Sequence, residues 1–250
     1  MTIRPRLTPA IADVRRAVRE GFAAAGLQAG DLVLVACSGG ADSLALAAAT
    51  AFEAPRAELR AGAVVIDHGM QPGSAQIAGE TAHKLSVLGL YPVEIRTVNV
   101  GTDGGPEAAA RTARYAAIDE VAELTGANAV MLGHTLNDQA ETVLLGLTRG
   151  SGPRSIAGME PIDGLFLRPL LSLSRETTEG LCNDSGLDFW VDPHNSDSNF
   201  TRVRIRQTVL PLLETEVGPG VTEALARTAD LLREDLELLD HLAAEQFRGL

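Results

Sequence analysis

The chain of 250 residues has only two cysteines, Cys37 and Cys182, and they lie far apart. Neither belongs to a CxxC pair, so the sequence does not indicate a zinc site or an iron–sulfur cluster. We expect both to be reduced, buried thiols, as is typical of cytoplasmic proteins. No hydrophobic run reaches the ~18 residues of a membrane span, and the N-terminus has no apolar signal core. These absences predict a cytoplasmic protein without membrane association.

Lysine is even scarcer than cysteine, because Lys84 is the only one in the chain. Arginine supplies all other positive side-chain charge, and 33 acidic against 21 basic residues give a net charge of −12. This balance argues against general nucleic-acid binding, which needs local positive charge. Seven arginines nevertheless fall in one later stretch: Arg149, Arg154, Arg168, Arg175, Arg202, Arg204 and Arg206. Any contact with a nucleic acid is therefore expected there.

Short hydrophobic runs alternate with helical patterns along most of the chain. The runs predict strands at 32–36, 61–66, 92–98, 129–132 and 166–167. Helices are expected at 9–26, from 44 onward, and at 77–88, 107–124, 136–147, 174–185, 203–214 and 221–247. The alternation predicts an α/β fold with a doubly wound parallel sheet. We expect a catalytic domain over residues 1–216 and a small C-terminal helical element over 217–250.

A glycine-rich loop, Ser38-Gly39-Gly40-Ala41-Asp42-Ser43, follows the first predicted strand and opens a helix. Glycines let the backbone approach phosphate oxygens, and helix N-terminal amides favour an anion. Ser38 and Ser43 add hydroxyl donors, whereas Asp42 would repel phosphate unless Mg²⁺ lay between them. The Walker motif and the dinucleotide fingerprint are both absent from the sequence. The loop therefore predicts binding of nucleotide phosphates, the alternative being a simple strand–turn–helix corner.

Two further stretches carry polar groups that suit a nucleotide. Asp67-His68-Gly69 ends the second predicted strand, where it would lie near adenine and ribose, or form only a turn. Arg111 and Arg114 are three residues apart on one predicted helix face. Two guanidinium groups on one face can clamp phosphate charge, and the alternative is a solvated basic face.

A third stretch, Gly133-His134-Thr135-Leu136-Asn137-Asp138-Gln139-Ala140-Glu141, begins at a strand end and enters a helix. His134, Asn137, Asp138 and Glu141 are spaced i, i+3, i+4 and i+7, which places them on one face. A histidine near the α-phosphate can stabilise developing charge, and carboxylates can hold an amine and accept its proton. The alternative is helix capping by Asn137 or Asp138.

The glycine loop resembles the pyrophosphate loop of the N-type ATP pyrophosphatases, which cleave ATP between the α- and β-phosphates. That resemblance implies an adenine-nucleotide α-hydrolase-like sheet. Across residues 30–215 the chain resembles the tRNA(Ile)-lysidine synthetase family. The resemblance rests on the stretches above and on six later motifs: Arg149-Gly150-Ser151-Gly152, Gly158-Met159, Arg168-Pro169-Leu170-Leu171, Asp192-Pro193-x-Asn195, Arg202-x-Arg204-Ile205-Arg206 and Leu210-Pro211.

This second resemblance implies the activity, the ligands and the roles of residues. The family joins L-lysine to C2 of the wobble cytidine of tRNA(Ile) with a CAU anticodon, through an O2-adenylated cytidine, using ATP and Mg²⁺. It also allows a homodimer. Residues that match the nucleotide site are Ser38, Gly39, Gly40, Ala41, Asp42, Ser43, Asp67, His68, Arg114, Gly133 and His134. Implied catalytic residues are Asp42 (also the metal ligand), Arg111, His134, Asn137, Asp138 and Glu141. Implied tRNA contacts are Arg149, Arg202, Arg204 and Arg206.

The chain departs from the family pattern at Asn137, where the family usually has aspartate. An amide neither accepts a proton as a general base nor pairs with an ammonium as a carboxylate does. We therefore expect retained ATP binding and weak or no lysidine formation, whether Asn137 is a natural variant or an engineered change. Many relatives also carry further C-terminal tRNA-recognition domains, so residues 217–250 are expected either to end a naturally short form or to start a truncated second domain.

Three other functions remain open at this point. A tRNA 2-thiolation enzyme of the same superfamily would typically carry CxxC pairs and a reactive cysteine. A small-molecule amide synthetase would suit the acidic charge but not the motifs from 192 to 206. A non-catalytic nucleotide-binding protein of the stress-protein kind would lack the acidic face after His134.

Overall fold

The computed structural model describes residues 7–67, 69, 73–98, 106–193 and 197–248, and the chain divides into two compact units. The first unit contains Met1–His134 and Ile162–Val191, and the second contains Thr135–Pro161 and Asp192–Leu250. Residues near 140 share a hydrophobic cluster with residues beyond 200, which joins segments that are distant in the sequence. The predicted catalytic domain over 1–216 and helical element over 217–250 stay predictions.

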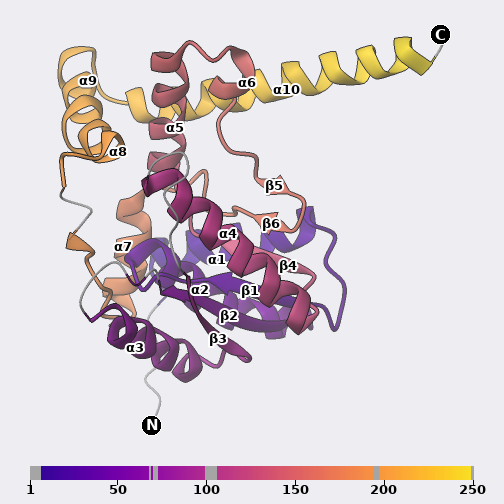
Figure 1. The fold of residues 1–250 in the computed structure, drawn as a ribbon, viewed down its shortest axis with the longest axis vertical. Coiled ribbons are helices and arrows are strands. Elements are labelled where there is room, and N and C mark those ends of the chain that lie inside the picture. Colours follow the sequence, from indigo (N-terminus) through magenta and orange to yellow (C-terminus); the bar gives the residue numbers. More distant parts are fainter. Residues whose placement is uncertain (1–6, 68, 70–72, 99–105, 194–196, 249–250) are drawn as a thin grey trace. The chain divides into compact units, whose positions relative to one another are not determined.

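The first unit is built on one six-stranded sheet (Figure 1). Its strands are β1 (Leu32–Ala36), β2 (Arg60–Asp67), β3 (Val93–Thr97), β4 (Ala129–Leu132), β5 (Ile162–Asp163) and β6 (Phe166–Leu167). Their order is β3-β2-β1-β4-β6-β5, and every neighbouring pair is parallel except β5 with β6. The predicted doubly wound parallel sheet is confirmed. The antiparallel β5 was not predicted, because two exposed residues carry no periodicity.

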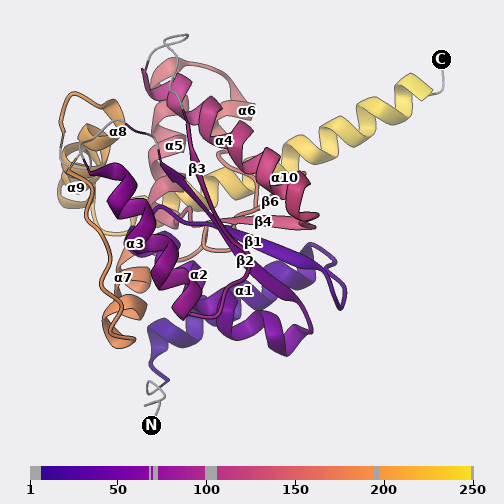
Figure 2. The same ribbon diagram turned by 60° about the horizontal axis from the view of Figure 1, so that its bottom comes forward.

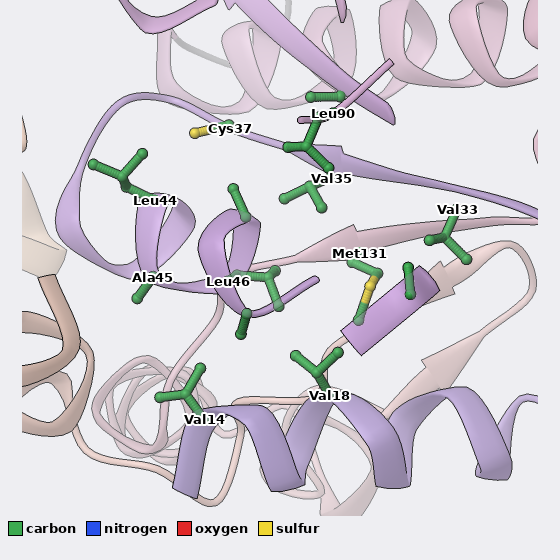
Figure 3. Packing of buried hydrophobic residues seen from close by; sticks show 14 of the residues in the cluster. Val14, Val18, Val33, Val35, Cys37, Leu44, Ala45, Leu46, Leu90 and Met131 are labelled. Atoms are coloured by element: carbon green, nitrogen blue, oxygen red, sulfur yellow. The ribbon is translucent and has the colours of Figure 1, made fainter. Parts of the chain in front are cut away.

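Helices cover both faces of this sheet (Figure 2). They are α1 (Pro9–Ala24), α2 (Ala41–Glu53), the 3₁₀ turn η1 (Ala54–Ala57), α3 (Ser74–Val87), α4 (Pro106–Thr125) and α7 (Arg175–Asp184). Alternate strand residues point to opposite faces. Val33, Val35 and Met131 pack with α1 and α2, as Figure 3 shows, whereas Leu32 and Leu34 pack with α4. Strands that are buried on both faces explain the continuous hydrophobic runs of the sequence.

The order of the strands defines the place where a ligand is expected. From β1 the sheet continues to β2 and β3 on one side, and to β4 on the other side. The carboxyl ends of β1 and β4 are therefore adjacent at the point where the winding direction changes. In open α/β sheets, ligands bind in the crevice beyond such a point. The glycine loop follows β1 and Gly133 follows β4, so both lie at this edge.

The second unit is helical. It contains α5 (Leu136–Arg149), α6 (Pro153–Ile156), α8 (Thr201–Arg204), the π-helical turn η3 (Ile205–Val209), α9 (Leu210–Glu216) and α10 (Val221–Arg248). Ala140 and Leu145 of α5 share a hydrophobic cluster with Ile205, Leu210 and Leu225. Among the described helices, none combines the length and hydrophobicity needed to span a lipid bilayer.

The single helix predicted at 203–214 contains a π-helical turn that the sequence pattern did not indicate. The Leu210 amide donates to the Ile205 carbonyl, five residues earlier. Pro211 follows directly, and its ring has no N–H to donate to the carbonyl of Gln207. The proline therefore accounts for a break in the ordinary i to i−4 pattern at this place. π-helical turns often occur at functional sites, and this one contains Arg206.

Candidate nucleotide-binding and catalytic site

The glycine loop ends in an open helix N-terminus. Gly40 is the N-cap residue of α2, with φ −74° and ψ 163°. Because glycine has no side chain, this residue makes no side-chain capping hydrogen bond to the helix. The first intrahelical bond runs from the Leu44 amide to the Gly40 carbonyl over 3.0 Å. The amides of the first turn thus have no partners within the helix, and they sit at its positive end. This arrangement suits a phosphate group.

Gly39 is held in a conformation that only glycine adopts easily. Its φ is +84°, and a Cβ at this residue would lie 2.6 Å from Thr81 Oγ1 of α3. The Trp190 amide donates to the Gly39 carbonyl over 2.9 Å. Both the backbone angle and the neighbouring atoms therefore require glycine here, as expected for close approach to phosphate.

The Ser43 side chain stabilises the loop from inside. Its hydroxyl accepts from the Ser38 amide at 3.2 Å and donates to the Gly40 carbonyl at 3.0 Å. Cys37 Sγ lies 3.4 Å from the same oxygen. Ser43 is buried and Ser38 is exposed. Ser43 thus fixes the shape of the loop, and its predicted contact with phosphate stays a prediction.

Asp42 lies in the first turn of α2 and contacts α7. Arg175 Nε donates to Asp42 Oδ2 over 3.2 Å, and the Thr178 hydroxyl donates to Asp42 Oδ1. About a fifth of the Asp42 side chain, 22%, remains exposed. Neither Arg175 nor Thr178 was predicted for this site, because they lie 133 and 136 residues away in the sequence and form no motif with the loop.

The residues at this place fit a magnesium ion that is shared with phosphate rather than enclosed by protein. Among the described residues, no three His, Cys, Asp or Glu side chains form a metal-binding group. Mg²⁺ commonly binds one or two carboxylates and completes its shell with phosphate oxygens and water. Asp42 can supply one such carboxylate, since it belongs to the loop itself and is partly exposed.

The end of β4 lies directly against the start of α2. A Cβ on Gly133 would come within 3.1 Å of the Asp42 carbonyl group and the Ser43 Cα. Only glycine permits this approach without a shift of backbone. His134 follows and is half-buried. The structure thus brings Gly133 to the glycine loop, as the nucleotide-site prediction requires.

The other predicted nucleotide contacts are placed less directly. Asp67, at the end of β2, is buried and accepts from the Gly69 amide over 2.9 Å, which is the turn considered as the alternative. His68 lies outside the described residues. Arg111 and Arg114 lie over the Tyr115 ring, with 4.9 and 5.6 Å to its centroid. Their contact with nucleotide stays a prediction.

The acidic face in the second unit is paired with an arginine. Arg206 donates to both Glu141 oxygens, at 2.6 and 3.1 Å, and to Asp138 Oδ1 at 3.2 Å. The Glu141 side chain is 0% exposed, so its charge is buried and requires this partner. Asp138 Oδ2 also accepts from the Thr135 amide and hydroxyl, both at 2.9 Å. Asp138 therefore caps α5 as well as pairing with Arg206, and Asn137 is half-buried beside it in the same turn.

The arginines predicted to contact tRNA have different surroundings. Arg204 donates to the Ser198 and Asn199 carbonyls at 2.7 and 2.9 Å, which closes the segment before α8. Arg206 is the partner of the acidic face described above. Arg149, at the end of α5, is exposed. The contact with tRNA stays a prediction for all four arginines: Arg149, Arg202, Arg204 and Arg206. Arg204 and Arg206 also bind groups within the protein.

Both cysteines are buried beside the glycine loop. Burial raises the pKa of the Cys37 thiol. Burial and the charge of Asp42 raise the pKa of the Cys182 thiol to about 12. A thiol with a raised pKa is mostly protonated at neutral pH and is a poor nucleophile. Both residues are therefore suited to packing rather than to covalent catalysis.

Comparison with known proteins gives one consistent result. The family model described as PP-loop domain matches residues 12–213. A "tRNA(Ile)-lysidine synthase" of Leifsonia xyli is 61% identical over 88% of the chain and 66% of its own length. Another "tRNA(Ile)-lysidine synthase", of Thermobifida fusca, is 58% identical over 93% of the chain and 71% of its own length. The chain thus spans about two thirds of the length of these relatives.

A solved structure, the U34-tRNA thiolase NcsA of Methanococcus maripaludis with its [4Fe-4S] cluster, has a TM-score of 0.70 to this chain. The superposition covers 90% of this chain and 80% of the thiolase chain, and the two sequences are 19% identical. At this identity the likeness concerns the fold alone.

Proposed function

Because the chain belongs to the PP-loop domain family, and within it to the tRNA(Ile)-lysidine synthases, we propose that it forms lysidine. The reaction joins the ε-amine of L-lysine to C2 of the wobble cytidine in a tRNA(Ile) with a CAU anticodon, and consumes ATP. The observation that carries this proposal is the 58% identity over 93% of the chain. The open helix N-terminus at Gly40 supports it, since the first step needs a phosphate site.

In the first step, the cytidine O2 attacks the α-phosphorus of ATP, the bond to the β-phosphate oxygen breaks, and pyrophosphate leaves. The amides of Gly40 to Ser43 would hold the phosphates that become pyrophosphate. His134, at the neighbouring strand end, would stabilise charge on the α-phosphate, and Arg111 and Arg114 would add positive charge. Asp42 is the residue that would hold Mg²⁺, and the ion would supply positive charge at the phosphates.

In the second step, the lysine ε-amine attacks C2 of the adenylated cytidine and displaces AMP. The amine must lose a proton to attack, so a carboxylate close to it would serve as base. Asp138 and Glu141 are the candidates. Because Arg206 is bound to both carboxylates, the incoming ammonium would have to share them with its guanidinium group.

The tRNA contacts belong to the proposal as well. Arg149, Arg202, Arg204 and Arg206 would contact tRNA phosphates, where each contact adds to the dependence of affinity on salt. From the family resemblance, we also propose that two copies of this chain form a homodimer.

The proposal is tested by mass spectrometry of a tRNA(Ile) transcript with a CAU anticodon. After incubation with ATP and L-lysine, the wobble cytidine should gain the mass of lysine less water, and AMP should form only when the tRNA is present. A transcript with another wobble base is the control and should gain no mass. AMP formation with a small-molecule acceptor alone would favour an amide synthetase and contradict the proposal.

The cysteines give a separate prediction that bears on 2-thiolation. At pH 8 the folded chain should react with a maleimide at least about tenfold more slowly than a free cysteine, because raised pKa values leave little thiolate. Reactivity should rise on unfolding in urea. The measurement is thiol labelling followed by mass spectrometry. Rapid labelling of either thiol in the folded chain would reopen the thiolation function.

A further inference from the structure

One face of α7 covers the start of α2. Arg175, Thr178 and Cys182 are spaced i, i+3 and i+7, so they share a helix face, which we call the α7 face. Two of them contact Asp42, and Cys182 Sγ lies 3.5 Å from the Ala41 carbonyl oxygen. Ala41 and Asp42 are the first two residues of α2. The α7 face is thus placed against the helix end that offers its amides to a ligand.

Both oxygens of the Asp42 carboxylate accept hydrogen bonds from the α7 face. Arg175 Nε lies 3.2 Å from Oδ2, and the Thr178 hydroxyl contacts Oδ1. The Thr178 oxygen is also 2.7 Å from the Arg175 carbonyl oxygen, but its single hydrogen can serve only one acceptor. A carboxylate is the stronger acceptor, so the hydrogen is assigned to Asp42. Two donors on two oxygens fix the rotation of the carboxylate.

The direction of this carboxylate matters because of where Asp42 lies. A carboxylate in the first turn of a helix is attracted by the positive N-terminus and its amides. If the carboxylate turned toward these amides, it would compete with phosphate for the same donors and repel it. Arg175 and Thr178 hold the carboxylate to the side of these amides instead, where it stays partly exposed for Mg²⁺, and Arg175 also offsets its charge.

We propose that Thr178 and Arg175 are positioning residues that hold the Asp42 carboxylate against α7, so that the amides of α2 bind the phosphates of the nucleotide. The identity of the nucleotide as ATP rests on the proposed function. Thr178 is fully buried and the Arg175 side chain is 21% exposed. The hydroxyl of Thr178 is therefore positioned to act on Asp42 rather than on solvent.

The test compares matched substitutions by the binding of inorganic pyrophosphate and of ATP, measured by isothermal titration calorimetry with and without Mg²⁺. Thr178→Val keeps the shape of the side chain and removes the donor, and should weaken pyrophosphate binding about tenfold. Thr178→Ser keeps the hydroxyl and should stay within about twofold. Arg175→Gln should weaken binding at least as much as Thr178→Val, and Arg175→Lys should restore part of it.

A second background separates positioning from a general structural role. In an Asp42→Ala chain the carboxylate is gone, so adding Thr178→Val should change pyrophosphate affinity by less than about twofold. Equal losses from Thr178→Val in both backgrounds would show that the hydroxyl does not act through Asp42 and would overturn the proposal. Unchanged affinity of Thr178→Val in the unaltered background would overturn it too. Thermal melting of each variant accompanies the titrations, and the Arg175 pair keeps the test valid if Thr178→Val fails to fold.

These measurements use neither tRNA nor lysine. If pyrophosphate binding depends on Thr178 but no lysidine forms, only the proposed reaction fails. If lysidine forms but pyrophosphate binding does not depend on Thr178, only the positioning role fails. An unaltered chain that binds neither pyrophosphate nor ATP would contradict both.

Discussion

Replacing Arg206 by methionine is expected to lower the free energy of unfolding by about 3 kcal/mol. The Glu141 side chain is 0% exposed and its two oxygens accept from Arg206 at 2.6 and 3.1 Å. Methionine would fill much of the space of arginine but leave the buried carboxylate without this partner. The cost of a buried charge that the guanidinium group no longer offsets then falls on the folded state. Urea denaturation at pH 7 measures the change as a shift of the midpoint.

Two controls separate this effect from the loss of any arginine. Arg16→Met removes a solvent-exposed partner of Asp13, in an ion pair of 2.8 Å, and should cost less than about 1 kcal/mol. The double change Glu141→Gln with Arg206→Met removes both charges and should recover part of the stability lost in Arg206→Met. An Arg206→Met chain as stable as the unaltered protein would mean that Arg206 does not stabilise the Glu141 carboxylate.

The substitution Asn137→Asp is expected to raise the rate of lysidine formation by about 100-fold. Asn137 lies in the first turn of α5, and helical spacing places it on the same face as Asp138 and Glu141. The two described carboxylates are bound to Arg206, so a carboxylate at position 137 would provide a further candidate base. A further negative charge on this face would also attract the lysine ammonium group. The rate is followed by incorporation of labelled lysine into tRNA(Ile).

The control for this change is Asn137→Ala, which should not raise the rate. Aspartate at the start of a helix also stabilises it, by about 0.3–1 kcal/mol, so melting temperatures of all three forms must accompany the rates. ATP affinity should be the same in all three, because the phosphate site in the first unit is unchanged. Equal rates with Asn and Asp would refute a role for a carboxylate at this position.

The sequence predicted the sheet and the strand–loop–helix order around the glycine loop well because both depend on local patterns. Continuous apolar runs such as 32–36 and 129–132 became β1 and β4 within the predicted limits. The loop from Ser38 to Ser43 has a glycine at φ +84° and an open helix N-terminus, which follow from residue types in a short segment. The departure at Asn137 was equally visible, since it is a change within a motif.

Other features could not be predicted because they depend on contacts between distant segments. Asp42 meets Arg175 and Thr178 only because α7 packs with α2. Arg206, which was expected to contact tRNA, donates to Glu141. It lies in a π-helical turn that the sequence pattern did not indicate, although Pro211 accounts for the turn once the structure is known. The second compact unit likewise joins α5 to helices beyond residue 200, which are distant in the sequence.

By itself, the sequence determined the parallel α/β sheet, the glycine loop and the acidic face, because periodicity and residue type act over a few positions. The tertiary structure alone decided which charges meet. It placed a guanidinium group on the acidic face and turned the loop carboxylate toward α7. Ion pairs form between side chains that are close in space, and a distance of 65 or 133 residues along the chain leaves no pattern from which such a pair can be predicted.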